Sequence, residues 1–153
     1  MAIRRKRQPE HYVNNKDFTA AVVAYVERKG ETPLPDYIAI CFMKMAEGLS
    51  HLPNFYLYSY RQDMVMDAVE NCIRAIQNYD YKAKTRSGNP NAFGYFNQIM
   101  YFAFLRRIAK EKRQQEIKER VIENATVEYF LDNSSDIDAN TIVERIRTRR
   151  EKY

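Results

Sequence analysis

The sequence predicts an all-α fold: a compact multi-helix domain with a flexible N-terminus and a short C-terminal helix. Apolar residues recur at three- and four-residue spacing along most of the 153 residues, the period of an amphipathic helix. Four glycines and five prolines leave few places to interrupt the chain, and most of them fall between the periodic segments. No alternating strand pattern with hairpin turns competes with these helices.

The N-terminal segment, residues 1–12, contains the basic run Arg4–Arg7 and is expected to be flexible. Asp17 is expected to cap a first helix. That helix should end at Gly30, because glycine readily adopts the left-handed conformation that stops a helix.

Pro33 and Pro35 separate this helix from a second one, expected from about Asp36 to Leu49. Residues 50–60 then form a Pro- and Asn-broken aromatic link.

An acidic, sharply two-sided helix is expected over residues 63–80. At 100° per residue one side collects apolar residues, namely Met64, Val65, Ala68, Val69, Cys72, Ala75 and Ile76. The opposite side collects polar ones, namely Asp63, Asp67, Glu70, Asn71, Arg74 and Asn78. Met66 alone is expected to break this partition. An exposed, adaptable thioether among carboxylates is typical of a protein contact.

Residues 81–90 have the small and polar residues of a turn, and Lys82, Lys84 and Arg86 could meet phosphates there. The next helix, from about residue 91 to 113, has more aromatics than one buried stripe can hold. Its predicted core face is Phe93, Phe96, Met100 and Phe104, and its predicted exposed face is Tyr95, Gln98, Phe102, Arg106 and Arg113. Rings, an amide and guanidinium groups together can stack on bases and hold phosphates.

Basic residues become frequent toward the end of this helix, including Arg107 and Lys110. After Arg120 we expect an acidic linker and a short helix over Asn140–Arg150, basic at its end as the helix dipole favours. The expected organisation is therefore an N-terminal segment 1–12, a helical domain 13–120, and a C-terminal segment 121–153.

The formal charge of +5 favours an anionic partner, although a solvated basic surface is the commoner cause of so modest a charge. Cys41 and Cys72 lie inside apolar helical patterns and are expected to be packed thiols, with no metal or cofactor. His11 and His51 have no neighbouring nucleophile or carboxylate that would make a triad, so no catalytic residue and no enzymatic activity are expected. No apolar run reaches the roughly 20 residues needed to span a bilayer.

Several strings, in order along the chain, carry a family resemblance. The stretch Asp63–Asp80 resembles region 2 of bacterial sigma factors, the helix by which they dock on RNA polymerase, and residues 91–113 resemble their promoter-recognition helix. Tyr12–Lys16, Ala46–Ser50 and Asn89–Ala92 are similar to one branch, the late-transcription sigma factors of T-even-like tailed bacteriophages. The resemblance covers roughly residues 12–118.

The resemblance implies two sets of site residues and a sigma region 2-like fold. The clamp of the largest subunit of the bacterial RNA polymerase core would be bound by Asp63, Met66, Asp67, Glu70 and Arg74. A·T-rich promoter DNA would be bound by Lys82, Lys84, Arg86, Tyr95, Gln98, Ile99, Phe102, Arg106, Arg107, Lys110 and Arg113. Met66 replaces the glutamine common in the family, and Gln98 and Ile99 replace what is often a tryptophan pair. Tyr95 falls where the family has the aromatic that stacks at the first melted base.

The resemblance also implies a location and further partners. The expected location is the cytoplasm of an infected bacterial host. Phage late sigma factors use a separate coactivator and a terminal apolar-acidic motif that binds the DNA sliding clamp. The nearest match here, Tyr129–Asp132, is internal, and packing against the domain is an equal use for it.

Two alternatives remain open from the sequence. One is a helical DNA-binding regulator that acts without joining RNA polymerase, in which the acidic helix is only a surface. The other is an interaction protein that binds a protein through that helix and ignores DNA. The second alternative leaves the predicted face of Tyr95, Phe102 and Arg106 without a use.

Overall fold

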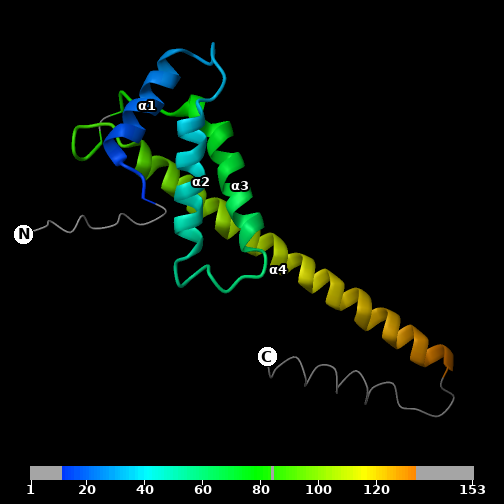
Figure 1. The fold of residues 1–153 in the computed structure, drawn as a ribbon. Helices are drawn as coiled ribbons and strands as arrows, with labels where there is room; N and C mark the ends of the chain where they lie inside the picture. Colours follow the sequence, from blue (N-terminus) through cyan, green and yellow to red (C-terminus); the bar gives the residue numbers. More distant parts are fainter. Residues whose placement is uncertain (1–11, 84, 134–153) are drawn as a thin grey trace, which may run out of the picture. The chain divides into compact units, whose positions relative to one another are not determined.

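The computed structural model describes residues 12–83 and 85–133, and every regular element among them is helical, which confirms the predicted all-α class (Figure 1). The predicted flexible segment 1–12, except Tyr12, and the predicted helix Asn140–Arg150 lie outside the described residues. The chain divides into two units, Met1–Ile108 and Ala109–Tyr153. The elements in order are α1 (Asn15–Glu27), α2 (Asp36–Ser50), α3 (Arg61–Ala75), the 3₁₀ helix η1 (Ile76–Asn78) and α4 (Ala92–Asn133).

The first helix starts earlier than predicted, because Asn14 and not Asp17 caps it. The Asn14 side chain accepts hydrogen bonds from the backbone N–H groups of Lys16 and Asp17, at 3.0 and 3.3 Å. Asp17 instead lies in the first turn, where its carboxylate interacts favourably with the positive end of the helix dipole. α1 ends at Glu27, three residues before the predicted end at Gly30. Lys29, with a φ of 50°, and Gly30, with a φ of 77°, both lie in the left-handed region, so Gly30 has the predicted conformation although it does not end the helix.

The second and third helices confirm the positions that apolar periodicity predicted, with shifted ends. α2 begins at Asp36 as expected and ends at Ser50, one residue after the predicted end. The predicted helix 63–80 begins at Arg61, is α-helical to Ala75 and continues as the single turn η1. Its predicted apolar side is the buried one, through Met64, Val65, Ala68, Val69, Cys72 and Ile76.

The fourth helix is much longer than predicted. The segment that we expected to be an acidic linker from residue 121 continues α4 as far as Asn133. Glu and Lys are good helix formers, and neither Gly nor Pro occurs between Gly94 and Asn133 to stop the helix. The charge of a segment therefore does not mark a linker when its residues are helix formers.

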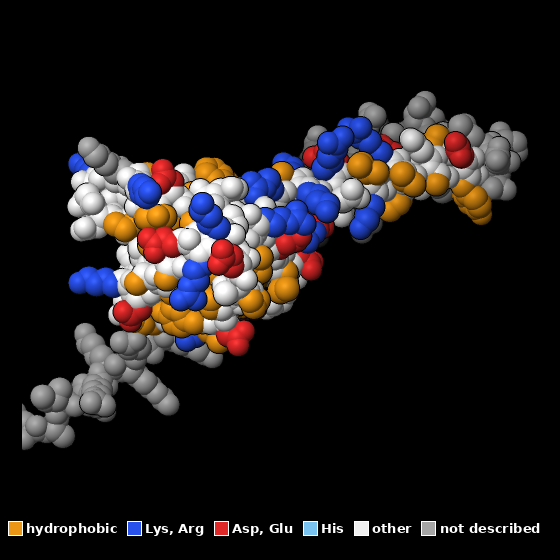
Figure 2. Space-filling view, turned by 90° about the horizontal axis from the view of Figure 1, so that it is seen from above, with side chains coloured by type: hydrophobic (Ala, Val, Ile, Leu, Met, Phe, Trp, Pro, Cys, Tyr) orange, Lys and Arg blue, Asp and Glu red, His pale blue; other side chains and the backbone are white. Residues whose placement is uncertain are grey.

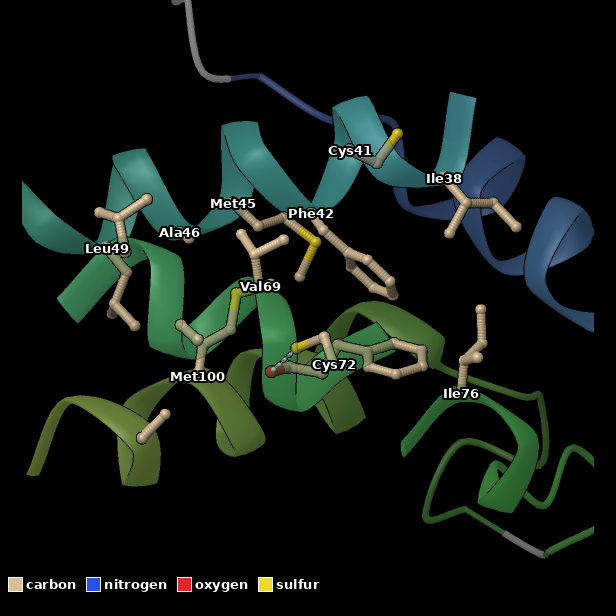
Figure 3. Packing of buried hydrophobic residues seen from close by; sticks show 14 of the residues in the cluster. Ile38, Cys41, Phe42, Met45, Ala46, Leu49, Val69, Cys72, Ile76 and Met100 are labelled. Atoms are coloured by element: carbon tan, nitrogen blue, oxygen red, sulfur yellow. Dashed lines mark hydrogen bonds between the residues drawn. The ribbon is translucent and has the colours of Figure 1, made fainter. Parts of the chain in front are cut away.

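The hydrophobic core of the first unit lies among α1, α2, α3 and the beginning of α4 (Figures 1 and 3). Three fully buried rings meet at its centre: Phe42 lies 5.9 Å from Phe18 and 4.8 Å from Phe96, with edge-to-face geometry. Met100 and Phe104 are also fully buried, as predicted, while Phe93 is half-buried. Burial of each of these phenylalanine rings stabilises the fold by about 1.5–3 kcal/mol. The packed rings therefore fix how α4 crosses α3.

Candidate protein-binding and nucleic-acid-binding surfaces

The outer side of α3 presents an acidic ridge, which we define as Asp63, Met66, Asp67, Glu70, Ile73 and Arg74. Met66 is 57% exposed, so its thioether lies at the surface, as predicted. Ile73 is 43% exposed and lies two turns further along the same side. The expectation that Met66 alone breaks the polar side is therefore wrong, because Ile73 does so as well. Two apolar side chains flanked by carboxylates make the ridge suitable for a basic partner with apolar side chains.

The carboxylates of the ridge are not equivalent. Asp63 and Glu70 are exposed, and Glu70 pairs with Arg74 one turn along the helix. Asp67 is half-buried and pairs with Arg107 of α4: Nε lies 2.7 Å from Oδ2, and Nη2 donates to Oδ1 at 3.1 Å. Beside this pair, Arg106 Nη2 donates to the amide oxygen of Asn71 at 3.3 Å. The Nη2 contact is a charge-assisted hydrogen bond, whereas Nε lies close to the carboxylate without hydrogen-bond geometry toward it.

This pairing joins a residue predicted to bind polymerase to one predicted to bind DNA. The Arg107 side chain is only 17% exposed and that of Asp67 34%. Arg107 is therefore held by the protein itself and is not displayed for a phosphate in the way that the sequence suggested. The other ridge residues stay exposed, so the two predicted surfaces meet along one edge without burying each other.

The turn between η1 and α4 and the first turn of α4 enclose a pocket of about 630 Å³. Two predicted DNA-binding residues, Arg86 and Tyr95, line it. The sequence did not single out the rest of the lining as a site: Asn78, Tyr79, Asp80, Ala83, Thr85, Ser87, Asn91 and Gly94. Aromatic rings with amide, hydroxyl, carboxylate and guanidinium groups around them can hold a flat polar ligand by stacking and hydrogen bonds.

Two tyrosine rings form the aromatic wall of this pocket. The ring centroids of Tyr79 and Tyr95 lie 5.1 Å apart, and Tyr95 lies 5.0 Å from Phe96 of the core. Tyr95 is therefore half-buried and packed on one side, and not fully exposed as the sequence suggested. Burial raises the pKa of the Tyr79 phenol above its ordinary value, so this ring is uncharged at neutral pH.

Hydrogen bonds between residues close in sequence shape the turn that lines the rest of the pocket. Lys82 N–H donates to the Asp80 side chain at 3.0 Å. Gly88, with a φ of 74°, donates its N–H to the Thr85 carbonyl at 2.9 Å. Asn91, the residue before α4, accepts from Gly94 N–H at 2.9 Å and so caps the helix. These bonds give the turn a defined shape beside Tyr95.

The remaining predicted DNA-binding residues divide by exposure. Gln98, Phe102 and Arg106 are exposed in the first unit, with Phe102 at 48%, whereas Ile99 is half-buried against the core. Lys82 is exposed and its ammonium lies 5.6 Å from the Tyr81 ring centre; Lys84 lies outside the described residues. Lys110 and Arg113 are exposed on the second unit, where Figure 2 shows Lys and Arg side chains gathered on α4.

The described residues contain no constellation that indicates catalysis. His51 lies at the end of α2, with its ring Nδ1 2.7 Å from the Glu47 carbonyl. Cys41 and Cys72 are buried thiols, and burial raises the pKa of Cys72 to about 12. Within residues 12–83 and 85–133, no group of three His, Cys, Asp or Glu side chains could hold a metal ion. No helix in the same ranges combines the length and apolarity required to cross a membrane.

No known protein-family model matches this chain, and the comparison with curated proteins gives no match.

Proposed function

We propose that this chain is a sigma factor that binds a bacterial RNA polymerase core and directs recognition and melting of a TATA-like element in phage late promoters. Its place of action would be the cytoplasm of the infected host. One observation supports this most: an exposed acidic ridge on α3 is followed by an aromatic pocket at the start of α4. The resemblance to sigma region 2 implies this same order of a polymerase-binding helix and a DNA-melting helix.

The acidic ridge is the proposed contact with the polymerase clamp. Asp63 and Glu70 would pair with basic side chains, and Met66 and Ile73 would pack against apolar ones. Charges at the edge of an interface mainly guide and orient association, whereas buried apolar anchors slow dissociation. Asp67 has a different role in this proposal, because its carboxylate is already held by Arg107.

The pocket at Tyr95 is the proposed site for a base that leaves the duplex. Pyrimidine–purine steps in A·T-rich DNA unstack easily. Flipping a base costs a few kcal/mol, and stacking it on an aromatic side chain returns about 1–3 kcal/mol. Because the two terms nearly cancel, hydrogen bonds from the pocket's polar lining would decide which base is accepted. Lys82, Lys84 and Arg86 from the turn, and Arg106 from α4, would bind phosphates and fix the register. Lys110 and Arg113 of the second unit are further proposed phosphate contacts.

Gln98 and Phe102 are exposed on the same helix and are proposed to contact the duplex upstream of the melted bases. Ile99 would support them from a half-buried position. Since this chain lacks the tryptophan pair often found there, and since Arg107 is held by Asp67, we expect weak DNA binding by the free protein. Promoter binding would become strong only on the polymerase. A late coactivator and the DNA sliding clamp are additional proposed partners.

Co-purification with a bacterial core polymerase tests this proposal. The full chain should remain bound to core enzyme through gel filtration, and a promoter fragment should bind the complex much more tightly than it binds either component. Tight, sequence-specific binding of duplex DNA by the free chain would instead support the alternative regulator. The internal use of Asp67 is the observation that favours that alternative, because it removes one carboxylate from the ridge.

A further inference from the structure

One polar contact connects α1 to the start of α4. Thr19 of α1 is 7% exposed, and its hydroxyl oxygen accepts a hydrogen bond from the backbone N–H of Ala92 at 3.2 Å. The two residues are 73 positions apart in the sequence. The Thr19 hydroxyl in turn donates to Asn15 Oδ1 at 3.2 Å, so its own proton is also satisfied. Thr19 thus uses both the donor and the acceptor capacity of its hydroxyl.

The other buried aliphatic hydroxyl in the described ranges bonds only near its own position. Ser50, at the end of α2, donates to the Glu47 carbonyl of its own helix at 2.8 Å. Thr19 differs because its partner lies at the first residue of another helix. The N–H groups in the first turn of a helix have no acceptor within that helix, so a partner from outside is needed when they are buried.

Ala92 lies between residues that line the pocket. Asn91 immediately precedes it, and Gly94 and Tyr95 follow it in the first turn of α4. Next to Thr19, the Phe18 ring lies 6.0 Å from that of Phe96, which fixes the same turn of α4 by an apolar contact. α1 therefore holds the beginning of α4 through one polar and one aromatic contact.

We propose that Thr19 is a positioning residue of the base-binding pocket, which sets the place of Tyr95 relative to Tyr79 by anchoring the Ala92 amide. The inference rests on the proposed function of that pocket. Without the hydroxyl, the buried Ala92 N–H loses its acceptor, a penalty of the size that shifts an equilibrium about tenfold. The first turn of α4 then moves or frays, and the two tyrosine rings lose their fixed spacing.

Two substitutions separate the hydroxyl from the shape of the side chain. Thr19→Val keeps the branched shape and removes the hydroxyl, whereas Thr19→Ser keeps the hydroxyl and removes a methyl group. In holoenzyme assembled with core polymerase, base flipping is followed by fluorescence of 2-aminopurine placed at the melted position. Thr19→Val should slow this signal roughly tenfold, and Thr19→Ser should stay near wild type. Association with the core, and the dependence of promoter binding on salt, should be unchanged in both.

Ser50→Ala is the matched control, because it also removes a buried hydroxyl but one that bonds within its own helix. It should leave base flipping unchanged. The proposal is overturned if Thr19→Val flips the base at the wild-type rate. It is equally overturned if Thr19→Ser is impaired as much as Thr19→Val, since the lost hydroxyl would then not explain the defect.

A measurement on the free protein keeps this inference separate from the proposed function. By NMR, Thr19→Val should speed hydrogen exchange of the Ala92 amide about tenfold and move the ring signals of Tyr79 and Tyr95, and Thr19→Ser should do neither. If the wild type neither binds polymerase nor flips a base, the proposed function fails, while the exchange result still decides whether Thr19 anchors α4. An unchanged Ala92 exchange rate would show that it does not.

Discussion

Asp67 on α3 and Arg107 on α4 form an ion pair, with N···O contacts of 2.7 and 3.1 Å, at the edge shared by the acidic ridge and α4, the proposed DNA-recognition helix. The pair holds the two helices together where one proposed surface ends and the other begins. Substitutions at either residue will therefore affect stability as well as binding. Exposed ridge residues are better probes of docking.

The ion pair should contribute measurably to stability. Because both side chains are at least half-buried and one of their contacts is a charge-assisted hydrogen bond, a double-mutant cycle with Asp67→Ala and Arg107→Ala should give a coupling free energy of about 1–2 kcal/mol. Urea unfolding followed by circular dichroism measures each variant. The Glu70–Arg74 pair is a matched control, since it is exposed and one turn apart in the same helix, and its coupling should not exceed about 0.5 kcal/mol. Equal coupling in the two cycles would mean that burial adds nothing to the Asp67–Arg107 pair.

Docking should depend on the exposed part of the ridge. Asp63→Lys combined with Met66→Lys should weaken association with core polymerase by roughly tenfold or more, because it replaces a carboxylate and an apolar anchor with like charges facing a basic partner. Biolayer interferometry with immobilised core enzyme gives the dissociation constant. Glu27→Lys, an exposed charge reversal at the end of α1, is the control and should bind as wild type. The docking surface is wrongly placed if the double variant also binds as wild type.

Tyr95 should act in promoter opening and not in docking. Tyr95→Ala removes the ring that faces Tyr79 and should reduce permanganate reactivity of promoter thymines about tenfold, the equivalent of one stacking interaction. Tyr95→Phe keeps the ring and should open the promoter nearly as well. Both variants should bind the core normally. If Tyr95→Ala opens DNA as well as Tyr95→Phe does, the ring has no part in melting.

Asn91 should have two roles. Its side chain caps α4 and stabilises the fold, and because that side chain is uncharged it does not repel DNA from the pocket. Asn91→Ala removes the acceptor for Gly94 N–H and should lower the free energy of unfolding by about 1 kcal/mol. Asn91→Asp keeps the cap, so its stability should be close to wild type, but its carboxylate in the pocket should repel DNA. Thermal unfolding and promoter binding by holoenzyme, measured on the same preparations, separate the two effects. Normal DNA binding by Asn91→Asp would argue against nucleic acid in this pocket.

Cys72 should make the free energy of unfolding fall as the pH rises above about 8.5. Its thiol is fully buried, donates weakly to the Phe96 carbonyl (Figure 3), and has its pKa raised to about 12 by burial. In the unfolded chain the same thiol ionises near pH 8.5. Its stabilising contribution is therefore complete below that pH and is lost as the pH rises toward 12. Between pH 8 and 10, wild type should lose about 2 kcal/mol more stability than Cys72→Ala in urea titrations. Val69→Ala, which also changes a buried side chain, should keep the wild-type dependence of the free energy of unfolding on pH. If wild type and Cys72→Ala show the same dependence, the raised pKa of Cys72 does not affect stability.

Local patterns in the sequence predicted the helices well, because the apolar period of α2 and α3 reports directly on which side is buried. The same patterns predicted the wrong cap for α1, because Asn14 and Asp17 are both capable acceptors and only the structure shows that Asn14 accepts the N–H groups of the first turn. They also predicted too early an end for α4, because the acidic charge after Arg120 indicates a linker while the residues themselves are good helix formers. Ile73 was missed because it is apolar on a side defined as polar.

The contacts that build the candidate site join residues distant in sequence, which periodicity does not report. Asp67 and Arg107 are 40 residues apart, and Thr19 and Ala92 are 73 apart. The predicted aromatic position Tyr95 does line a pocket, but the shape of that pocket comes from turn hydrogen bonds such as the Asn91 cap. Residue types thus indicated the chemistry, and tertiary packing decided which residues are available for it.

Run-off transcription tests the central claim most directly. Linear A·T-rich late phage DNA is transcribed by a bacterial core polymerase, with this chain present or absent and with the Tyr95→Ala and the Asp63→Lys, Met66→Lys variants in parallel. Discrete transcripts should appear only when the chain is present, and both variants should reduce their yield about tenfold or more, one at opening and the other at docking. Transcription that is the same with and without the wild-type chain, under conditions where a known sigma factor activates the same core, would contradict the proposed function.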